Sequence, residues 1–160
     1  MEKVKEVPYG VADFVTVMEQ NLYYVDKTMF IPELEKQPRN LFFIRPRRFG
    51  KSTFLSMLHS YYDCNQSAKF QSLFGNLWIG QHPTELQGKY QVLFLDFSQV
   101  SGNIDSLERN FDFYCSVKLD GFMRRYGEAY SEETREKVRK AEYAMDKLAF
   151  IHDEAAQKGF

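Results

Sequence analysis

The first 45 residues place apolar positions in patterns that each predict one kind of element. Residues 11–18 repeat apolar side chains every three or four positions, which predicts a short helix. Thr28 can cap a second helix over residues 29–36. The run LFFIR, residues 41–45, is a continuous apolar run of strand length. Such a run is typical of a strand buried in a parallel sheet.

A turn and a longer helix follow this predicted strand directly. The turn is PRRFG, and KSTFLSMLHSYY at residues 51–62 begins from it as a helix. Leu55, Leu58 and Tyr62 recur at intervals of three and four residues, so we expect them to form the buried face of this helix. Residues 63–90 alternate aromatic clusters with polar connectors and are predicted to be rich in loops.

The second half of the chain predicts one more strand and two helices. QVLFLDF, residues 91–97, repeats the apolar pattern of a strand. The helices after it are predicted to begin at Ser101 or Asn103 and at Ser131, and the last of them to end at Gly159. The order strand, helix, strand, helix, helix predicts an α/β fold in which helices connect the strands of a parallel sheet.

Length and composition predict one domain over residues 1–160, with residues 1–40 as an N-terminal helical extension. The formal net charge of −1 argues against a protein that binds nucleic acid over its whole surface. Cys64 and Cys115 lie far apart, with no cysteine or histidine at ligand spacing, so no zinc site is predicted. The sequence shows no signal-peptide pattern and no run near the ~20 apolar residues that span a bilayer. We expect a cytoplasmic protein that does not bind a membrane.

The turn between the first predicted strand and its helix carries most of a phosphate-binding motif. The pattern G-x-x-x-x-G-K-[ST] is met in its second half by Gly50, Lys51 and Ser52, whereas Arg45 stands at the first glycine position. Gly50 can take backbone angles that let the main chain approach a phosphate oxygen. Lys51 offers a charge to the terminal phosphates, and the Ser52 hydroxyl is the expected magnesium ligand.

Backbone amides at the start of this helix are expected to complete the site. Helix amides that lack a helical acceptor point toward the positive end of the helix dipole, where anions bind. The sequence therefore predicts ATP and Mg²⁺ as ligands. The predicted nucleotide-binding residues are Arg48, Phe49, Gly50, Lys51, Ser52 and Thr53.

A second interpretation of the same segment rests on its charge. The basic patch, from Arg39 to Lys51, holds four arginines and one lysine with no acidic residue between them. Such a patch suits a polyanion, including nucleic acid, without any enzymatic step. Arg47 and Arg48 could equally be solvated or paired with acidic side chains.

Blocks on both sides of the loop resemble a known family. PYGVADF, YYVDKTMFIPELE, FIRPRRFGKSTFLSML, LFGNLWIG and YQVLFLDFS are similar, in order, to segments of the bacterial AAA-ATPase-like proteins, which usually precede a PD-(D/E)XK nuclease-like domain. The resemblance reaches from residue 8 to about 98. It implies a partial P-loop NTPase three-layer sandwich over residues 1–160, with residues 41–62 as its strand, P-loop and helix. A departure from glycine at the position of Arg45 is common in that family.

Asp26 and Lys27 match a family block without a derivable role, and Asp26 is as well suited to ordering the turn beside it.

An acidic residue on another strand is needed to hold magnesium in a P-loop ATPase. Asp96, at the end of the second predicted strand, is the candidate for magnesium and catalysis, with loop capping as its alternative role. Asp153 and Glu154 also follow an apolar run, but the three- and four-residue spacing around them indicates a helix. The resemblance implies that the acidic Walker B strand and the nuclease-like domain would come after residue 160.

Three functions stay open at this point. The first is an ATP- and Mg²⁺-binding module, the front portion of a larger ATPase, that hydrolyses ATP poorly by itself. The second is a polyanion-binding module that uses the basic patch, with nucleic acid bound only through the full-length protein. The third is a fragment with a role in assembly, because unpaired strand edges favour self-association or pairing with a missing C-terminal domain.

Overall fold

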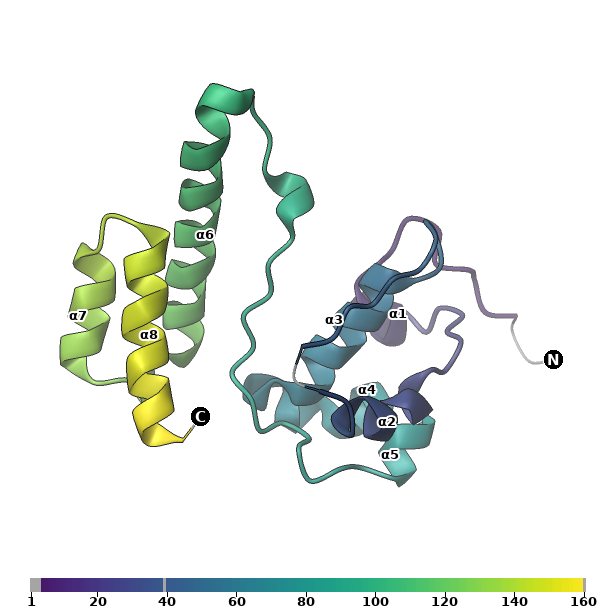
Figure 1. The fold of residues 1–160 in the computed structure, drawn as a ribbon. Helices are drawn as coiled ribbons and strands as arrows, with labels where there is room; N and C mark the ends of the chain where they lie inside the picture. Colours follow the sequence, from purple (N-terminus) through teal and green to yellow (C-terminus); the bar gives the residue numbers. More distant parts are fainter. Residues whose placement is uncertain (1–3, 39, 160) are drawn as a thin grey trace. The chain divides into compact units, whose positions relative to one another are not determined.

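The computed structural model describes residues 4–38 and 40–159 and consists of helices joined by segments without regular structure (Figure 1). The chain divides into two compact units, Met1–Tyr90 and Gln91–Phe160. Each unit has its own buried side chains. Arg39, one end of the basic patch, lies outside the described residues.

The first unit is built from short helices around one longer helix, α3. The chain enters α3 through irregular backbone, and the single residue Asp63 separates the end of α3 from η2. The elements in order are α1 (Phe14–Glu19), η1 (Thr28–Phe30), α2 (Ile31–Glu35), α3 (Lys51–Tyr62), η2 (Cys64–Lys69), α4 (Phe70–Phe74) and α5 (Trp78–Gln81). The helix predicted at residues 51–62 therefore has the bounds that the sequence indicates.

Aromatic side chains fill the core of the first unit. The Phe14 ring meets the Phe74 ring at a centroid distance of 5.0 Å, and the Tyr61 ring meets Phe74 at 5.6 Å, edge to face. On α3 the buried apolar residues are Phe54, Met57 and Tyr61. The predicted buried face, at Leu55, Leu58 and Tyr62, is one residue out of register: Leu58 and Tyr62 are partly buried and Leu55 is 44% exposed. The observed and the predicted series both have helical spacing. Packing against α1 and α4 buries the observed series, Phe54, Met57 and Tyr61.

A network centred on Asp26 anchors the segment before η1. One carboxylate oxygen of Asp26 accepts hydrogen bonds from the Thr28 amide and hydroxyl, at 2.8 and 2.7 Å. The other oxygen accepts from the Trp78 amide at 2.7 Å, and the Thr28 hydroxyl accepts from the Ile79 amide. Two unpaired amides at the start of α5 are thereby satisfied. Asp26 thus orders the turn beside it, as one of its two interpretations predicted.

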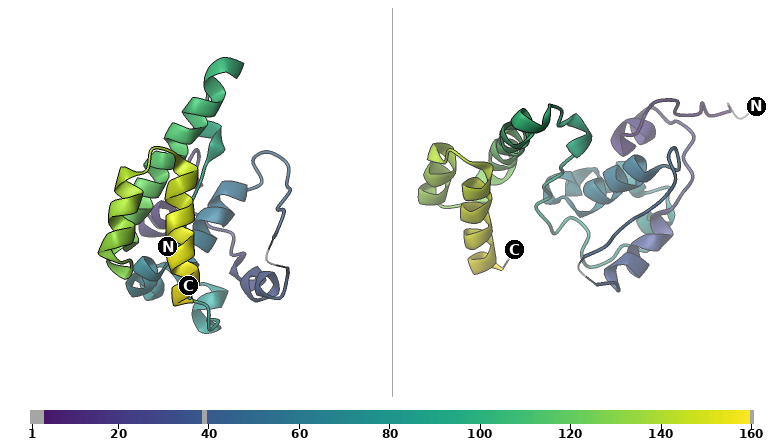
Figure 2. Two further views of the ribbon diagram at one scale, coloured as in Figure 1. Left: turned by 60° about the vertical axis from the view of Figure 1, so that its left-hand side comes forward. Right: turned by 45° about the horizontal axis from the view of Figure 1, so that its top comes forward.

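The second unit is a group of three helices, visible side by side in Figure 2. These are α6 (Ile104–Tyr126), α7 (Glu132–Lys140) and α8 (Ala144–Lys158), with short turns η3 (Phe97–Gln99) and η4 (Gly127–Ala129). Asn103 caps α6, Ser131 caps α7 and Gly159 ends α8 with a φ of 77°, so these predicted boundaries are confirmed. The chain leaves the helix between Ala141 and Tyr143, which divides the predicted last helix into α7 and α8.

The predicted α/β fold, a parallel-sheet P-loop sandwich, is wrong for this structure. Within residues 4–38 and 40–159 the β-type pairing is one isolated parallel bridge, between Asp63 and Tyr90. A strand is stable only when neighbouring strands satisfy its amides and carbonyls. The runs 41–45 and 91–97 belong to different units and form no ladder.

Side chains take the place of a strand partner along the second run. The Val92 amide donates to the Tyr126 hydroxyl at 3.2 Å, and the Asp96 amide donates to the Tyr114 hydroxyl at 2.6 Å. The first run is open to solvent instead: Phe42 is 93% exposed and Ile44 is 87% exposed. Both apolar runs, over residues 41–45 and 91–96, thus have irregular backbone in this structure. No helix in the described part of the chain is both long and apolar enough to cross a membrane.

Candidate phosphate-binding loop

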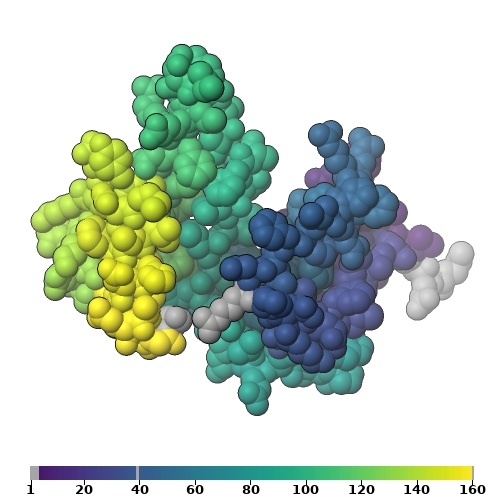
Figure 3. All heavy atoms as spheres, viewed as in Figure 1, coloured from purple at the N-terminus to yellow at the C-terminus, as the bar shows by residue number. Residues whose placement is uncertain are grey.

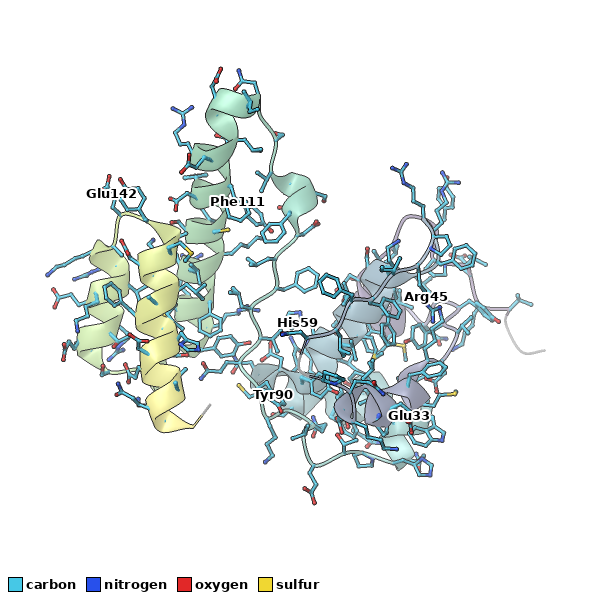
Figure 4. All side chains as sticks on the ribbon, in the orientation of Figure 1. Glu33, Arg45, His59, Tyr90, Phe111 and Glu142 are labelled. Atoms are coloured by element: carbon cyan, nitrogen blue, oxygen red, sulfur yellow. The ribbon has the colours of Figure 1, made fainter. Side chains whose placement is uncertain are left out.

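Residues 41–50 form an arm that runs beside α3 and turns into its first residue (Figures 1 and 4). The Phe43 ring stacks on the Phe54 ring of α3 at a centroid distance of 5.0 Å. The Arg45 guanidinium lies over the Phe43 ring, 5.0 Å from its centroid. The arm therefore packs on α3 through the Phe43 ring, although it forms no strand. The dark blue atoms of residues 40–50 lie on the face of the first unit seen in Figure 3.

Two residues of the turn have left-handed backbone. Arg48 has a φ of 65° and Gly50 a φ of 69°. For Gly50 this conformation carries no steric penalty, whereas for an arginine it costs about 1 kcal/mol. Such outliers concentrate at ligand-binding turns, where the surrounding structure holds them in place. The predicted need for glycine at position 50 is thus met by its observed conformation.

Lys51 folds back over the turn that precedes it. Its ammonium donates to the carbonyl oxygen of Arg45 at 2.7 Å and to that of Pro46 at 3.1 Å. These contacts close the residues from Arg45 to Lys51 into a ring of backbone and side chain. The residue at the first glycine position takes part through its carbonyl group, which any amino acid supplies. Arginine at position 45 is therefore compatible with a closed loop.

The first turn of α3 presents amides without helical acceptors. The first backbone hydrogen bond of the helix runs from the Phe54 amide to the Gly50 carbonyl at 2.9 Å. The amides of Lys51, Ser52 and Thr53 precede it, and no side chain in the described structure caps this end. The helix dipole adds a partial positive charge at the same place. Of the six predicted binding residues, Arg48 and Phe49 lie in the turn, Gly50 is the N-cap and residues 51–53 form the first turn of α3.

The arginines around the loop are solvated. Arg45, Arg47 and Arg48 are exposed, and among the described residues none of them forms an ion pair. Of the two roles open to Arg47 and Arg48, solvated or paired, the structure shows the first. Their charge is available to a ligand that arrives from solution.

A second lysine, outside the predicted site, lies next to the loop. A Cβ atom placed on Gly50 would lie 3.7 Å from the ammonium of Lys27. Lys27, Gly50 and Thr53 line one pocket of about 230 Å³ with seven further residues. No motif spacing connects Lys27 with Gly50, since 23 positions separate them. The block YVDKT marked the segment, but only the fold brings it to the loop.

Asp96 has a capping role in the second unit. Its carboxylate accepts from the Ser98 hydroxyl at 2.7 Å and from the Ser98 amide at 3.1 Å, which caps η3. The Ser98 hydroxyl is the main reason why the pKa of Asp96 lies below its usual value. Because Ser52 and Asp96 belong to different units, a shared magnesium site stays a prediction. In the ranges that the structure covers, no group of three His, Cys, Asp or Glu side chains could hold a metal ion.

Glu154, the other acid considered for catalysis, holds two helices together. It lies on α8 and accepts from the Ser131 amide at 2.8 Å and the Ser131 hydroxyl at 2.9 Å. The Lys158 ammonium lies 2.6 Å from the same carboxylate. Hydrogen bonding by Lys158, the largest contribution, and by Thr134 and Ser131 lowers the pKa of Glu154 from 4.5 to about 2. Asp153 beside it is exposed, and both residues are helical as the spacing predicted.

Comparison with known proteins bears directly on this loop. Residues 8–158 match the family described as Predicted AAA-ATPase. The chain belongs to this family. The match extends well beyond the region of resemblance found from the sequence blocks and includes the helices of the second unit. Membership in a predicted AAA-ATPase family agrees with a nucleotide-dependent role for the chain.

One curated relative shares part of the sequence. Over 63 residues the chain is 43% identical to the "Uncharacterized protein in vnfD 5'region" of Azotobacter chroococcum mcd 1. The shared segment is 39% of this chain and 12% of that protein, so the chain matches a small part of the length of its relative. No solved structure matches the chain.

Proposed function

We propose that the first unit binds the phosphate chain of ATP, together with Mg²⁺, at residues 48–53. The observation that carries the proposal is the start of α3, where Gly50 has left-handed backbone and three amides lack helical acceptors. In this role Lys51 exchanges its two carbonyl partners for phosphate oxygens, and the Ser52 hydroxyl is a ligand of the magnesium ion. Family membership supports a nucleotide as the ligand.

The chain then acts as the nucleotide-binding portion of an ATPase, and hydrolysis by this portion alone is slow. A hydrolysing site needs a carboxylate that completes the magnesium shell and a group that orients water. Asp96 is the proposed source of the first. Its carboxylate is engaged in the cap of η3, so recruiting it would break two hydrogen bonds to Ser98.

Equilibrium binding tests the proposal. ATP is titrated into the chain with and without Mg²⁺, and into Lys51→Ala and Lys89→Ala. Lys89 is an exposed lysine of the same unit that comes later in the chain than the C-terminal end of α3. Its variant therefore controls for the loss of one positive charge. We expect affinity that improves with Mg²⁺ and falls by about tenfold, which equals 1.4 kcal/mol, in Lys51→Ala alone. Equal affinities for the two variants would refute the phosphate loop.

The exposed arginines support a second candidate, a polyanion-binding surface. Salt separates the two functions. Affinity for a nucleic-acid backbone falls steeply with ionic strength because bound counterions are released. Binding of ATP through amides and magnesium depends on Lys51 and on the metal more than on salt. A steep salt dependence without need for Mg²⁺ would favour the second candidate.

A further inference from the structure

We infer that Lys27 is a second cation for the phosphate chain, reaching the loop from a separate segment of the first unit. This inference rests on the proposed nucleotide site and adds a residue to it. Its basis is the position of the Lys27 ammonium, 3.7 Å from where a side chain at Gly50 would begin. A residue without a side chain at position 50 leaves this approach open.

The segment that carries Lys27 is fixed on both sides. Asp26 before it and Thr28 after it belong to the hydrogen-bond network that ends at α5. Thr28 is fully buried. The backbone of Lys27 is thus held in position, and only the side chain has freedom to move. Such anchoring reduces the entropy lost when an ammonium group binds a ligand.

The charges around Lys27 favour an anion. Both carboxylate oxygens of its neighbour Asp26 already accept bonds from Thr28 and Trp78. Within the described chain Lys27 has no ion pair and no side-chain hydrogen bond. Lys27 and the positive end of the α3 dipole both lie at Gly50, where like charges repel. An anionic ligand at this point relieves the repulsion.

Lys27 and the start of α3 line the same pocket, where we expect the phosphate group to bind. Lys27, Gly50 and Thr53 line it together with apolar side chains such as Val17. A phosphate group bound in this pocket would lie close both to the ammonium of Lys27 and to the first turn of α3. We expect Lys27 to contribute to binding through charge, so ligands with more phosphate groups depend on it more.

The experiment compares Lys27→Met, Lys27→Arg and the control Lys89→Met. Methionine keeps most of the apolar stem and removes the charge. We expect Lys27→Met to raise the Kd of Mg-ATP by about tenfold, the lower end for a charged hydrogen bond. Lys27→Arg should retain most of the affinity, and Lys89→Met all of it. The loss should be larger for ATP than for AMP and should shrink with added salt.

The outcomes for the parent chain and the Lys27 variants separate this inference from the proposed function. Unfolding curves followed by the fluorescence of Trp78, the single tryptophan, check that Lys27→Met is as stable as the parent chain. If the parent binds ATP and Lys27→Met binds it as tightly as Lys89→Met, the role of Lys27 is refuted and the phosphate loop stands. If the parent chain fails to bind ATP, the proposed function and this inference both fall. If Lys27→Arg loses as much affinity as Lys27→Met, shape and not charge is responsible, which also overturns the inference.

Discussion

The ammonium of Lys51 lies 2.7 Å from the carbonyl oxygen of Arg45 and donates a hydrogen bond to it. This contact joins the motif lysine to the residue that stands where the motif has glycine. In the closed loop Lys51 satisfies backbone acceptors of the arm, and in the proposed complex it satisfies phosphate oxygens. Binding therefore exchanges one set of acceptors for another and leaves the charge of Lys51 partnered in both states.

Replacing Gly50 by alanine tests the backbone requirement of the loop. No atom lies within 3.4 Å of the added Cβ, so the cost comes from the left-handed φ of 69°. We expect a loss of about 1 kcal/mol in the free energy of unfolding. We also expect an ATP affinity lowered by about tenfold, or 1.4 kcal/mol, because the amides of the first turn are reoriented.

Gly10→Ala is the matched control for this variant. Gly10 has a φ of 74°, and a Cβ atom added there would have no atom within 4 Å. Its alanine variant should lose similar stability in urea unfolding while binding ATP normally. If Gly10→Ala weakens ATP binding as much as Gly50→Ala does, the effect arises from general destabilisation and the loop argument fails.

Removing the Asp26 carboxylate should destabilise the first unit. Asp26→Ala leaves the amides of Thr28 and Trp78 without their acceptor. We expect a loss of about 2 kcal/mol, the upper range for a helix cap. The fluorescence of Trp78 during urea unfolding measures it directly. Glu85→Ala removes an exposed carboxylate of the same unit, and a loss no greater than that of this control would contradict the network.

The second unit should lose stability in acid through Glu154. The pKa of Glu154 is about 2 in the folded chain and near 4.5 when unfolded, so the unfolded state binds its proton first. The stabilisation by Glu154 is therefore complete above about pH 4.5 and disappears as the pH falls toward 2.

Thermal melting of Glu154→Gln checks this expectation. At pH 7 the variant should melt below the parent chain, because glutamine has no charge to offer Lys158. Near pH 2 the two should melt together. Asp153→Asn alters the exposed neighbouring carboxylate and serves as control. A difference between Glu154→Gln and parent that persists unchanged from pH 7 to pH 2 would show that the charge of Glu154 is not what stabilises the helices.

Local signals along the chain predicted the boundaries of the longer helices. They did not predict η2, α4 and α5, because residues 63–90 were expected to be rich in loops. Gly50 and Lys51 fix the start of α3, and Asn103 and Ser131 bond the first amides of their helices. Each of these boundaries depends on residues within one turn. The helix around residues 131–158 has a break that spacing alone did not indicate, because Val138, Ala144 and Ile151 remain buried on both sides of it.

The sheet was not predictable in the same way. LFFIR has the composition of a buried strand, but whether it becomes one depends on partners elsewhere in the chain. In this structure Phe43 packs on Phe54 of α3, and the hydroxyls of Tyr114 and Tyr126 bind the amides of the second run. These contacts are distant in sequence and leave no periodic signal.

In the candidate site, too, neighbouring residues were predictable from the sequence and residues brought together by the fold were not. Residues 48–53 were predicted because the motif is contiguous. Lys27 was not assigned a role, since its approach to Gly50 depends on how η1 and α5 are tied together by Asp26 and Thr28. A short motif thus identifies the loop, and the fold adds the residue that comes from outside it.

The most direct test of the central claim is to observe the backbone amides at the start of α3 while ATP is added. Amide resonances of the 18.9 kDa chain, labelled with ¹⁵N, are followed during titration with Mg-ATP. The amides of Gly50, Lys51, Ser52 and Thr53 should shift most, while those near Tyr62 at the far end of the helix stay in place. Unchanged amides at residues 50–53 in a sample that binds ATP would show that the nucleotide binds elsewhere and that this helix start is not its phosphate site.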